Sequence, residues 1–500
     1  MGSYRINMNK GAETNVVKSI GWTVASKWSS KLIGMVNTII LARLLAPEDF
    51  GIVAMATIIL AMLDAMTQVG VNLYIFRQKG DDPRLFNTAW TVNIIQGLVI
   101  ALIVVLAAPA VAGFFGEAAV LNIIYCLAAT KLIQGFQNVG VLIAQKQLKF
   151  HIDFYVTLTT RVSYLVVTLS LAIWLKSYWA IVFGQMTSVL IGVCSSYFFH
   201  SYRPKFQLYN WRPLYHYSLS TIPLSLGRYF NNNSDSAIVG KFTSAHFLGG
   251  YHVVSNLAGL FTKELLMPVI RGLIPNLSRL KDQADFDKTY RLTLALAVYA
   301  FLPIGIGLSM VSTELIHVLL GDQWLNFANI LAWLSIYMMI NGILMFASEQ
   351  ILVIMNKEYL SNRLMWYRNM VLFSTLGVIY YLDDYHQLPF ALVVSTLFTL
   401  PIILWTIATV FKRSIGFFIV MWWPAIISCG LMAAVLYFVP FSDDIFPLLL
   451  LGLKIATGLV IYLVSVLGLF IIRGYPEHSP EALLISKAPL IKRLTILKKA

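Results

Sequence analysis

Apolar residues in this chain gather in long runs, and short polar stretches separate the runs. A helix that crosses a membrane needs about 20 mainly apolar residues, and runs of that length recur fourteen times. The connections are too short to hold a soluble domain. The pattern therefore predicts an all-α polytopic membrane protein with about 14 transmembrane helices. The predicted spans are 17–43, 50–76, 85–113, 118–144, 151–175, 178–200, 213–240, 247–275, 290–312, 328–354, 359–381, 388–411, 416–439 and 446–472.

One polar interruption of the apolar pattern occurs twice, first in LARLLAPEDFGIVAM and again in AIVGKFTSAHFLGGYHVV. A shift of 198 positions places Arg43 on Lys241 and Gly51 on Gly249. In each copy a helix ends in a basic residue, and a hydrophobic residue followed by glycine opens the next helix. Because the shift equals six predicted spans, we expect two six-helix lobes around a central cavity, a plan that transporters with parallel repeats share.

This repeat gives the expected domain organisation. Two further C-terminal helices follow the second lobe, and a basic tail ends the chain. The predicted ranges are 1–200 for the N-lobe, 201–212 for a cytoplasmic linker, 213–411 for the C-lobe, 412–472 for the two extra helices and 473–500 for the cytoplasmic tail.

Composition and charge agree with a membrane protein and fix its expected orientation. Hydrophobic residues make up 58% of the chain and charged residues 12%, whereas soluble domains carry about 25% charged residues. The net charge of +14 comes from basic residues that occupy alternate connections, beginning with the N-terminal segment. Cytoplasmic loops accumulate lysine and arginine, so both termini are expected on the cytoplasmic side. Topology explains the basic charge, and no nucleic-acid partner is expected.

Several ionisable residues fall at membrane depth. Each costs at least about 2.5–3.5 kcal/mol on insertion scales, so such groups usually face a cavity or a partner. An excess of cations there suits an anionic substrate, and guanidinium groups bind phosphate oxygens in a bidentate manner. The predicted cationic substrate-binding residues are Lys27, Lys31, Lys131, Arg161, Arg228 and Lys263. Lys27 and Lys31 share one helix face, and Lys31 could instead pair with Asp64 to hold two helices together.

Amides and carboxylates complete the set of candidate site residues. Asn231, Asn232 and Asn233 lie in the seventh span, where unpaired amides are costly. They either line a polar cavity that contacts sugar hydroxyls or join the two lobes, and we favour the cavity. The candidate carriers of a coupling proton or sodium ion are Asp64, Asp235 and Glu264, because desolvation raises a carboxyl pKa toward the working range.

The first helix and the turn after it carry a family resemblance. The segment GWTVASKWSSKLIGMVNTIILARLLAPEDFGIVAMA resembles the Wzx-type polysaccharide exporters, with Trp22, Trp28 and the Phe50-Gly51 pair among the shared features. Farther on, GDQWLNFANILAWLS resembles the G-x-x-W turn of the same proteins. These exporters are oligosaccharide-lipid flippases of the multidrug/oligosaccharidyl-lipid/polysaccharide (MOP) superfamily, and the likeness is strongest to its colanic-acid and teichuronic-acid branch.

The resemblance implies a function and a location. It implies movement of undecaprenyl-pyrophosphate-linked oligosaccharide units from the inner to the outer leaflet of the bacterial cytoplasmic membrane. Alternating access, ion-coupled antiport by H+ or Na+, and partnership with glycosyltransferases and a polysaccharide polymerase are implied as well. The chain has no nucleotide-binding loop, so ATP-driven transport is not expected, and no cysteine spacing suits a metal. We expect no catalytic residues, no metal site and no other cofactor.

Three other readings remain open from the sequence. A membrane glycosyltransferase or polymerase would need a larger outer loop, although Asp383-Asp384 and Asp443-Asp444 could imitate its catalytic acids. A multidrug exporter of the same superfamily would use a more acidic cavity. A non-transporting scaffold is disfavoured by the number of charges at membrane depth.

Overall fold

The computed structural model is built of helices and connecting segments, with no strand among the residues that it describes. The described residues are 10–78, 80, 82–264, 283–345, 348, 351–412, 414, 416–439, 441 and 446–474. Within the described residues, each predicted span overlaps a helix or two consecutive helices, and eight helices there are long and apolar enough to cross a membrane. The predicted all-α membrane fold is therefore confirmed, and the count of fourteen crossings stays a prediction.

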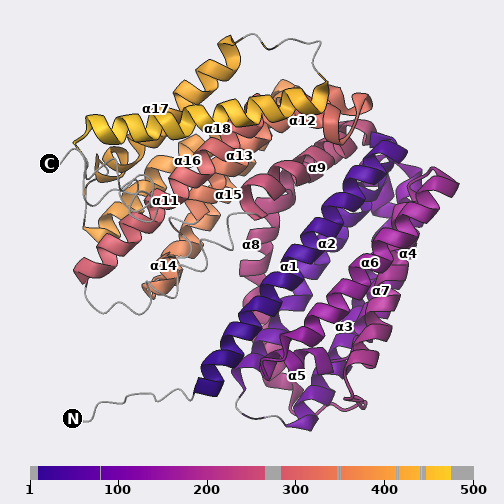
Figure 1. The fold of residues 1–500 in the computed structure, drawn as a ribbon. Coiled ribbons are helices and arrows are strands. Elements are labelled where there is room, and N and C mark those ends of the chain that lie inside the picture. Colours follow the sequence, from indigo (N-terminus) through magenta and orange to yellow (C-terminus); the bar gives the residue numbers. More distant parts are fainter. Residues whose placement is uncertain are drawn as a thin grey trace, which may run out of the picture. The chain divides into compact units, whose positions relative to one another are not determined.

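The chain divides into two compact units, Met1–Gly250 and Tyr251–Ala500. In the first unit α1 packs on α6, α6 on α7, α7 on α4 and α4 on α3, while α2 packs on α8; these helices run side by side in Figure 1. The helices of this unit are α1 (Lys10–Leu44), α2 (Pro47–Arg77), α3 (Pro83–Phe115), α4 (Ala118–Gly135), α5 (Gly140–Lys146), α6 (Phe150–Leu175), α7 (Trp179–Phe199), α8 (Trp211–Phe242) and the start of α9 (Ala245–Gly259).

The second unit is built around α11, which packs on α13 and α17. Its aromatic core includes Tyr290 stacked on Phe411 with ring centroids 4.5 Å apart. The elements of this unit are the end of α9, the π-helix η1 (Leu260–Glu264), α11 (Gln283–Met310), α12 (Ser312–Leu319), η2 (Asp322–Phe327), α13 (Ala328–Met345), α14 (Ile351–Ile354), α15 (Glu358–Leu382), η4 (Tyr385–Gln387), α16 (Leu388–Phe411), α17 (Gly416–Phe438) and α18 (Pro447–Ile472).

Helix α8 groups with the first unit, although the sequence assigned this span to the second lobe. The Tyr229 hydroxyl donates a hydrogen bond to the Ile58 carbonyl of α2 at 2.9 Å. Tyr229 is buried, so this bond satisfies a polar group that would otherwise be costly inside the bundle. The two compact units are defined by which residues lie close in space, whereas the repeat is defined by order along the chain. The predicted lobe ranges stay a prediction.

The two copies of the sequence repeat meet each other in the structure. A Cβ atom added to Gly51 of α2 would lie 1.8 Å from the Ala245 carbonyl oxygen of α9, and one added to Gly249 would lie 1.7 Å from the Pro47 carbonyl oxygen. Pro47 and Ala245 are themselves 198 positions apart. The contact is therefore reciprocal, as at a two-fold interface. Only glycine at both positions lets the two helix starts approach this closely.

Asp49 joins the turn before α2 to the turn before α7. Its carboxylate accepts hydrogen bonds from the backbone N–H of Ala46 at 3.1 Å and of Tyr178 at 2.8 Å. Burial raises the pKa of Asp49, and these two hydrogen bonds oppose that shift. The carboxylate thus links two turns within the first unit.

Replacing Asp49 by alanine is expected to destabilise the protein by about 1–3 kcal/mol, because two backbone N–H groups lose their acceptor. Thermal unfolding of the purified protein in detergent measures the loss. Glu48→Ala is the matched control, because it removes the same charge from the same helix start and Glu48 is exposed. Equal unfolding temperatures for the two variants would show that Asp49 does not join the two turns.

The predicted linker at 201–212 is held along the start of α3. Phe206 packs on Trp90 with ring centroids 4.8 Å apart, and the Arg84 guanidinium lies 4.5 Å from the centre of the Tyr209 ring. Alternate backbone N–H groups of the linker also donate to polar side chains of α3. These bonds run from Lys205 to Asn87 Oδ1, from Gln207 to Thr91 Oγ1 and from Tyr209 to Thr88 Oγ1.

The two C-terminal helices belong to the core of the second unit. The Lys454 ammonium of α18 forms an ion pair with the Glu314 carboxylate of α12, and the Tyr462 hydroxyl donates to the Tyr299 carbonyl of α11 at 2.8 Å. Lys454 lies in a predicted span, yet the sequence reasoning did not include it among the charges at membrane depth. A lone lysine in the apolar run 446–472 was the signal that could have revealed this pair.

Candidate functional site

An ion pair between α2 and α4 is the clearest arrangement of predicted site residues in the first unit. The Asp64 Oδ2 and Lys131 Nζ atoms are 2.6 Å apart, and the same ammonium donates to Gln134 Oε1 at 3.3 Å. The Asp64 side chain is 28% exposed and the Lys131 side chain 14%. The pair is thus sheltered but still accessible to a small ion or to an anionic group.

Close packing of α3 against α4 positions the lysine. A Cβ atom added to Gly97 of α3 would lie 2.9 Å from the Lys131 carbonyl oxygen, and one added to Gly135 of α4 would lie 3.0 Å from the Asn93 carbonyl oxygen. Small residues at such crossings let membrane helices approach closely. The Lys131 backbone is therefore fixed against α3, while its side chain reaches Asp64 on α2.

The pair brings together two groups for which we predicted separate roles from the sequence. Lys131 was predicted to bind an anionic substrate, and Asp64 to carry a coupling ion. An entering phosphate would compete with Asp64 for the ammonium, since a lysine side chain has only three donors. A cation bound at Asp64 would cancel the carboxylate charge and release the lysine. The geometry can therefore exchange an internal ion pair for one with a ligand.

A polar stripe lies on one face of α8. The i, i+3, i+4, i+7 spacing of a single helix face is followed by Arg228, Asn231, Asn232 and Asp235. Arg228 and Asn232 are exposed in the first unit, and Asn231 and Asp235 are half-buried. The arginine and the amides that the sequence placed in a polar cavity thus share one accessible face, and their contact with substrate stays a prediction.

Asn233 differs from its two neighbours. Its amide nitrogen donates to the Tyr229 carbonyl of its own helix at 3.0 Å. The residue lies on the side of α8 that carries Tyr229, and Tyr229 binds α2. Part of the hydrogen-bonding capacity of Asn233 therefore serves the helix itself.

The remaining predicted cations lie on α1 and α6 or outside the described side chains. Lys27 and Lys31 are exposed on α1, and Arg161 is exposed on α6. Because α1 packs on α6, these three charges come from one pair of neighbouring helices. Lys263 and Glu264 belong to η1, but their side chains are not among those that the structure describes.

A buried arginine in the second unit is held by an amide. Arg368 is 6% exposed, and its guanidinium donates to Asn341 Oδ1 of α13. This hydrogen bond links α15 to α13. No three His, Cys, Asp or Glu side chains in the described ranges lie close enough together to hold a metal ion.

Comparison with known proteins places the chain among membrane proteins of polysaccharide synthesis. The family described as "Polysaccharide biosynthesis protein" matches residues 40–329, which is more than half of the chain. The lipopolysaccharide biosynthesis protein WzxC of Escherichia coli is 22% identical, and the match covers 62% of this chain and 65% of WzxC. The teichuronic acid biosynthesis protein TuaB of Bacillus subtilis is 21% identical, with 94% of this chain and 97% of TuaB covered.

The length of these matches differs between relatives. The chain spans just under two thirds of three curated relatives, namely 65%, 63% and 65% of their length. Among solved structures, the lipid II flippase MurJ in an inward closed conformation has a TM-score of 0.73 at 13% identity, covering 90% of this chain and 99% of MurJ. At that identity the likeness shows the fold alone, and it agrees with the all-α membrane architecture expected from the sequence.

The resemblance seen in the first helix and the Pro47–Gly51 turn thus agrees with the family whose match begins at residue 40. The match includes both copies of the repeat and extends beyond α12. This multi-pass membrane protein belongs to the polysaccharide biosynthesis protein family.

Proposed function

We propose that this protein is a flippase that moves undecaprenyl-pyrophosphate-linked oligosaccharide units from the inner to the outer leaflet of the bacterial cytoplasmic membrane by alternating access. The family, the MurJ-like fold and relatives named for lipopolysaccharide and teichuronic acid biosynthesis support the substrate class. Glycosyltransferases would supply the lipid-linked unit, and a polymerase would consume it on the outer face. Both termini lie in the cytoplasm in this proposal.

The Asp64–Lys131 pair is the observation that carries the proposal. A pyrophosphate linkage is anionic, and an ammonium held at 2.6 Å from a carboxylate is ready to accept it in exchange. The pair already satisfies both charges when no substrate is bound, so the empty protein does not leave a charge isolated inside the bundle. The polar face of α8, with Arg228 and Asn232, supplies further groups suited to phosphate oxygens and sugar hydroxyls.

Electrostatics of this pair constrains how ion coupling works. A proton or sodium ion on Asp64 frees Lys131, so cation binding at Asp64 and anion binding at Lys131 favour each other. Antiport requires that cation and substrate compete. If the protein is an antiporter, as expected from the resemblance, the coupling cation therefore binds at Asp235 or Glu264, and Asp64 serves substrate exchange.

Reconstitution into lipid vesicles tests the proposed function. The substrate is a fluorescently labelled undecaprenyl-pyrophosphate oligosaccharide, and a quencher that cannot cross the membrane reports the labelled lipid in the outer leaflet. Without protein the quencher reaches only the outer leaflet. With the protein we expect almost complete quenching, because the labelled lipid then exchanges between leaflets.

Imposed proton and sodium gradients in the same vesicles identify the coupling ion and its direction. A labelled phospholipid is the control, and its distribution should stay unchanged. Quenching no greater than in protein-free vesicles, by protein that remains folded and inserted, would contradict the flippase proposal. Movement of cationic dyes without movement of the lipid-linked sugar would instead favour a drug exporter.

A further inference from the structure

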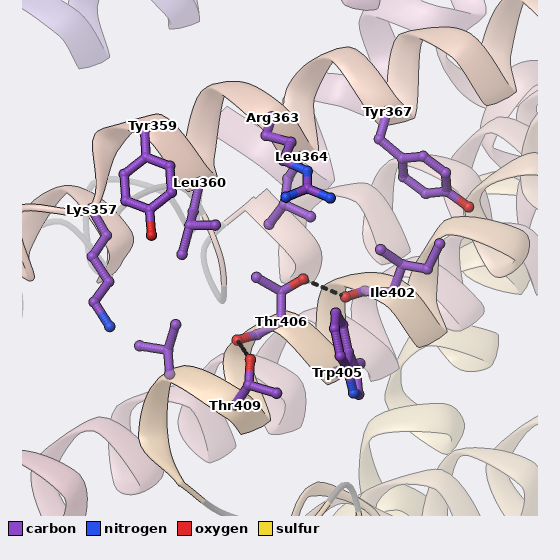
Figure 2. Close-up of a pocket in the computed structure, with 11 residues that line it drawn as sticks. Lys357, Tyr359, Leu360, Arg363, Leu364, Tyr367, Ile402, Trp405, Thr406 and Thr409 are labelled. Carbon is purple, nitrogen blue, oxygen red and sulfur yellow. Dashed lines mark hydrogen bonds between the residues drawn. The ribbon is translucent and has the colours of Figure 1, made fainter.

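A cavity of about 570 Å³ lies between α15 and α16 in the second unit. The Asp64–Lys131 pair belongs to the first unit, and the residues that line this cavity fall outside residues 40–329, which match the family. Figure 2 shows Lys357, Tyr359 and Arg363 pointing from the side of α15 toward α16. We propose that this cavity binds the headgroup of an anionic phospholipid from the cytoplasmic leaflet.

Two cations supply the charge that such a headgroup needs. In the described part of the chain, the Lys357 ammonium and the Arg363 guanidinium have no carboxylate partner, and both line the cavity. Glu358, the carboxylate in the first turn of α15, does not line it. Basic pockets between membrane helices on the cytoplasmic side are a recurring way to bind anionic lipid headgroups.

The cavity also has the aromatic and apolar surfaces of a lipid site. Tyr359 is 68% exposed and Trp405 is 60% exposed, and such rings favour the boundary between headgroups and acyl chains. Leu360 and Ile402 add apolar surface on the two helices. The hydroxyl of Thr406 donates to the Ile402 carbonyl at 2.8 Å, so charged groups rather than this hydroxyl would donate to a phosphate.

Size and position favour a phospholipid over the lipid-linked oligosaccharide. A volume of about 570 Å³ lies within the range of small-molecule sites, about 300–1,000 Å³, and suits a phosphate headgroup with the first part of its acyl chains. The connection that holds Lys357 is one of those that the charge pattern places in the cytoplasm. The two cations therefore lie at the depth of inner-leaflet phosphates, and the aromatic rings lie beside the glycerol region.

Native mass spectrometry of the full-length protein tests the site. Protein released from nanodiscs of phosphatidylglycerol is compared with protein from nanodiscs of phosphatidylcholine, and retained lipid is titrated. The wild type should retain phosphatidylglycerol and not phosphatidylcholine. In the double variant Lys357→Gln/Arg363→Gln the apparent Kd should rise roughly 30-fold, since each basic residue contributes about 1 kcal/mol near an anionic surface.

The control variant Lys205→Gln/Arg212→Gln removes two exposed cations from a different cytoplasmic connection and should retain the lipid as the wild type does. Arg363→Lys keeps the charge and should also retain it, which separates binding from folding. Equal retention by the Lys357→Gln/Arg363→Gln variant, equal binding of phosphatidylcholine, or preferential retention of the lipid-linked oligosaccharide would overturn the proposal. Lipid retention and flipping are measured separately, so failure of this proposal and failure of the proposed flippase function can be told apart.

Discussion

Gly249→Ala is expected to unfold or severely destabilise the protein, and Gly51→Ala should have a similar effect. In either variant the new methyl group would lie less than 2 Å from a backbone carbonyl oxygen of the facing helix. No side-chain rotation relieves such a contact, because the obstacle is backbone. Overpacking typically costs about 1–3 kcal/mol, and we expect at least the upper end of that range here.

Thermal unfolding in detergent and flipping in vesicles together test this prediction. Gly34→Ala is the matched control, since its methyl group meets no atom within 4 Å and alanine favours a helix more than glycine does. The double variant Gly51→Ala/Gly249→Ala should be only slightly worse than either single variant. Both substitutions separate the same two helix starts, and coupled sites are not additive. Normal stability and flipping in both single variants would show that the reciprocal contact is not required.

Removing one member of the Asp64–Lys131 pair is expected to abolish flipping. Lys131→Met removes the ammonium that binds Asp64, and Asp64→Asn removes the carboxylate that binds Lys131. Breaking a buried ion pair costs about 3–5 kcal/mol; because these side chains are 14% and 28% exposed, we expect a smaller loss of about 1–3 kcal/mol in each variant.

Exchange of the two charges separates function from stability. The variant Asp64→Lys/Lys131→Asp rebuilds an ion pair between α2 and α4, so its unfolding temperature should recover most of the loss. Flipping should not recover, because the ammonium would then project from α2 and the Lys131 position on α4 would carry a negative charge. The measurements are thermal unfolding and the labelled-lipid quenching assay. Recovered flipping in the exchanged variant would mean that the pair only holds two helices together.

Periodicity of apolar residues was enough to place the helices. The predicted span 85–113 lies within α3, and 388–411 coincides with α16, because the length of a membrane helix is fixed by the bilayer rather than by its neighbours. The same information missed the break between α4, which ends at Gly135, and α5, which begins at Gly140. Helix interruptions depend on local packing and hydrogen bonds, which do not appear in a hydropathy pattern.

Candidate site residues were harder to predict than helices. A lysine or a carboxylate at membrane depth is visible in the sequence, so Asp64, Lys131 and Arg228 could all be selected. The partners of these residues could not be predicted, because the pairing of Asp64 with Lys131 follows from the close crossing of α3 and α4 at Gly97 and Gly135. In the sequence alone, several cations were equivalent candidates to pair with Asp64.

The amino-acid sequence by itself determined the class of this protein, its helices, its orientation signal and its two-copy repeat. Hydropathy and loop charge act over one helix at a time, so a linear chain records them directly. Only the tertiary structure decided that Gly51 and Gly249 meet, that Asp64 binds Lys131, and that Lys357 and Arg363 face one cavity with Trp405. Each of these contacts joins residues of different helices, and their distances follow from how the helices pack.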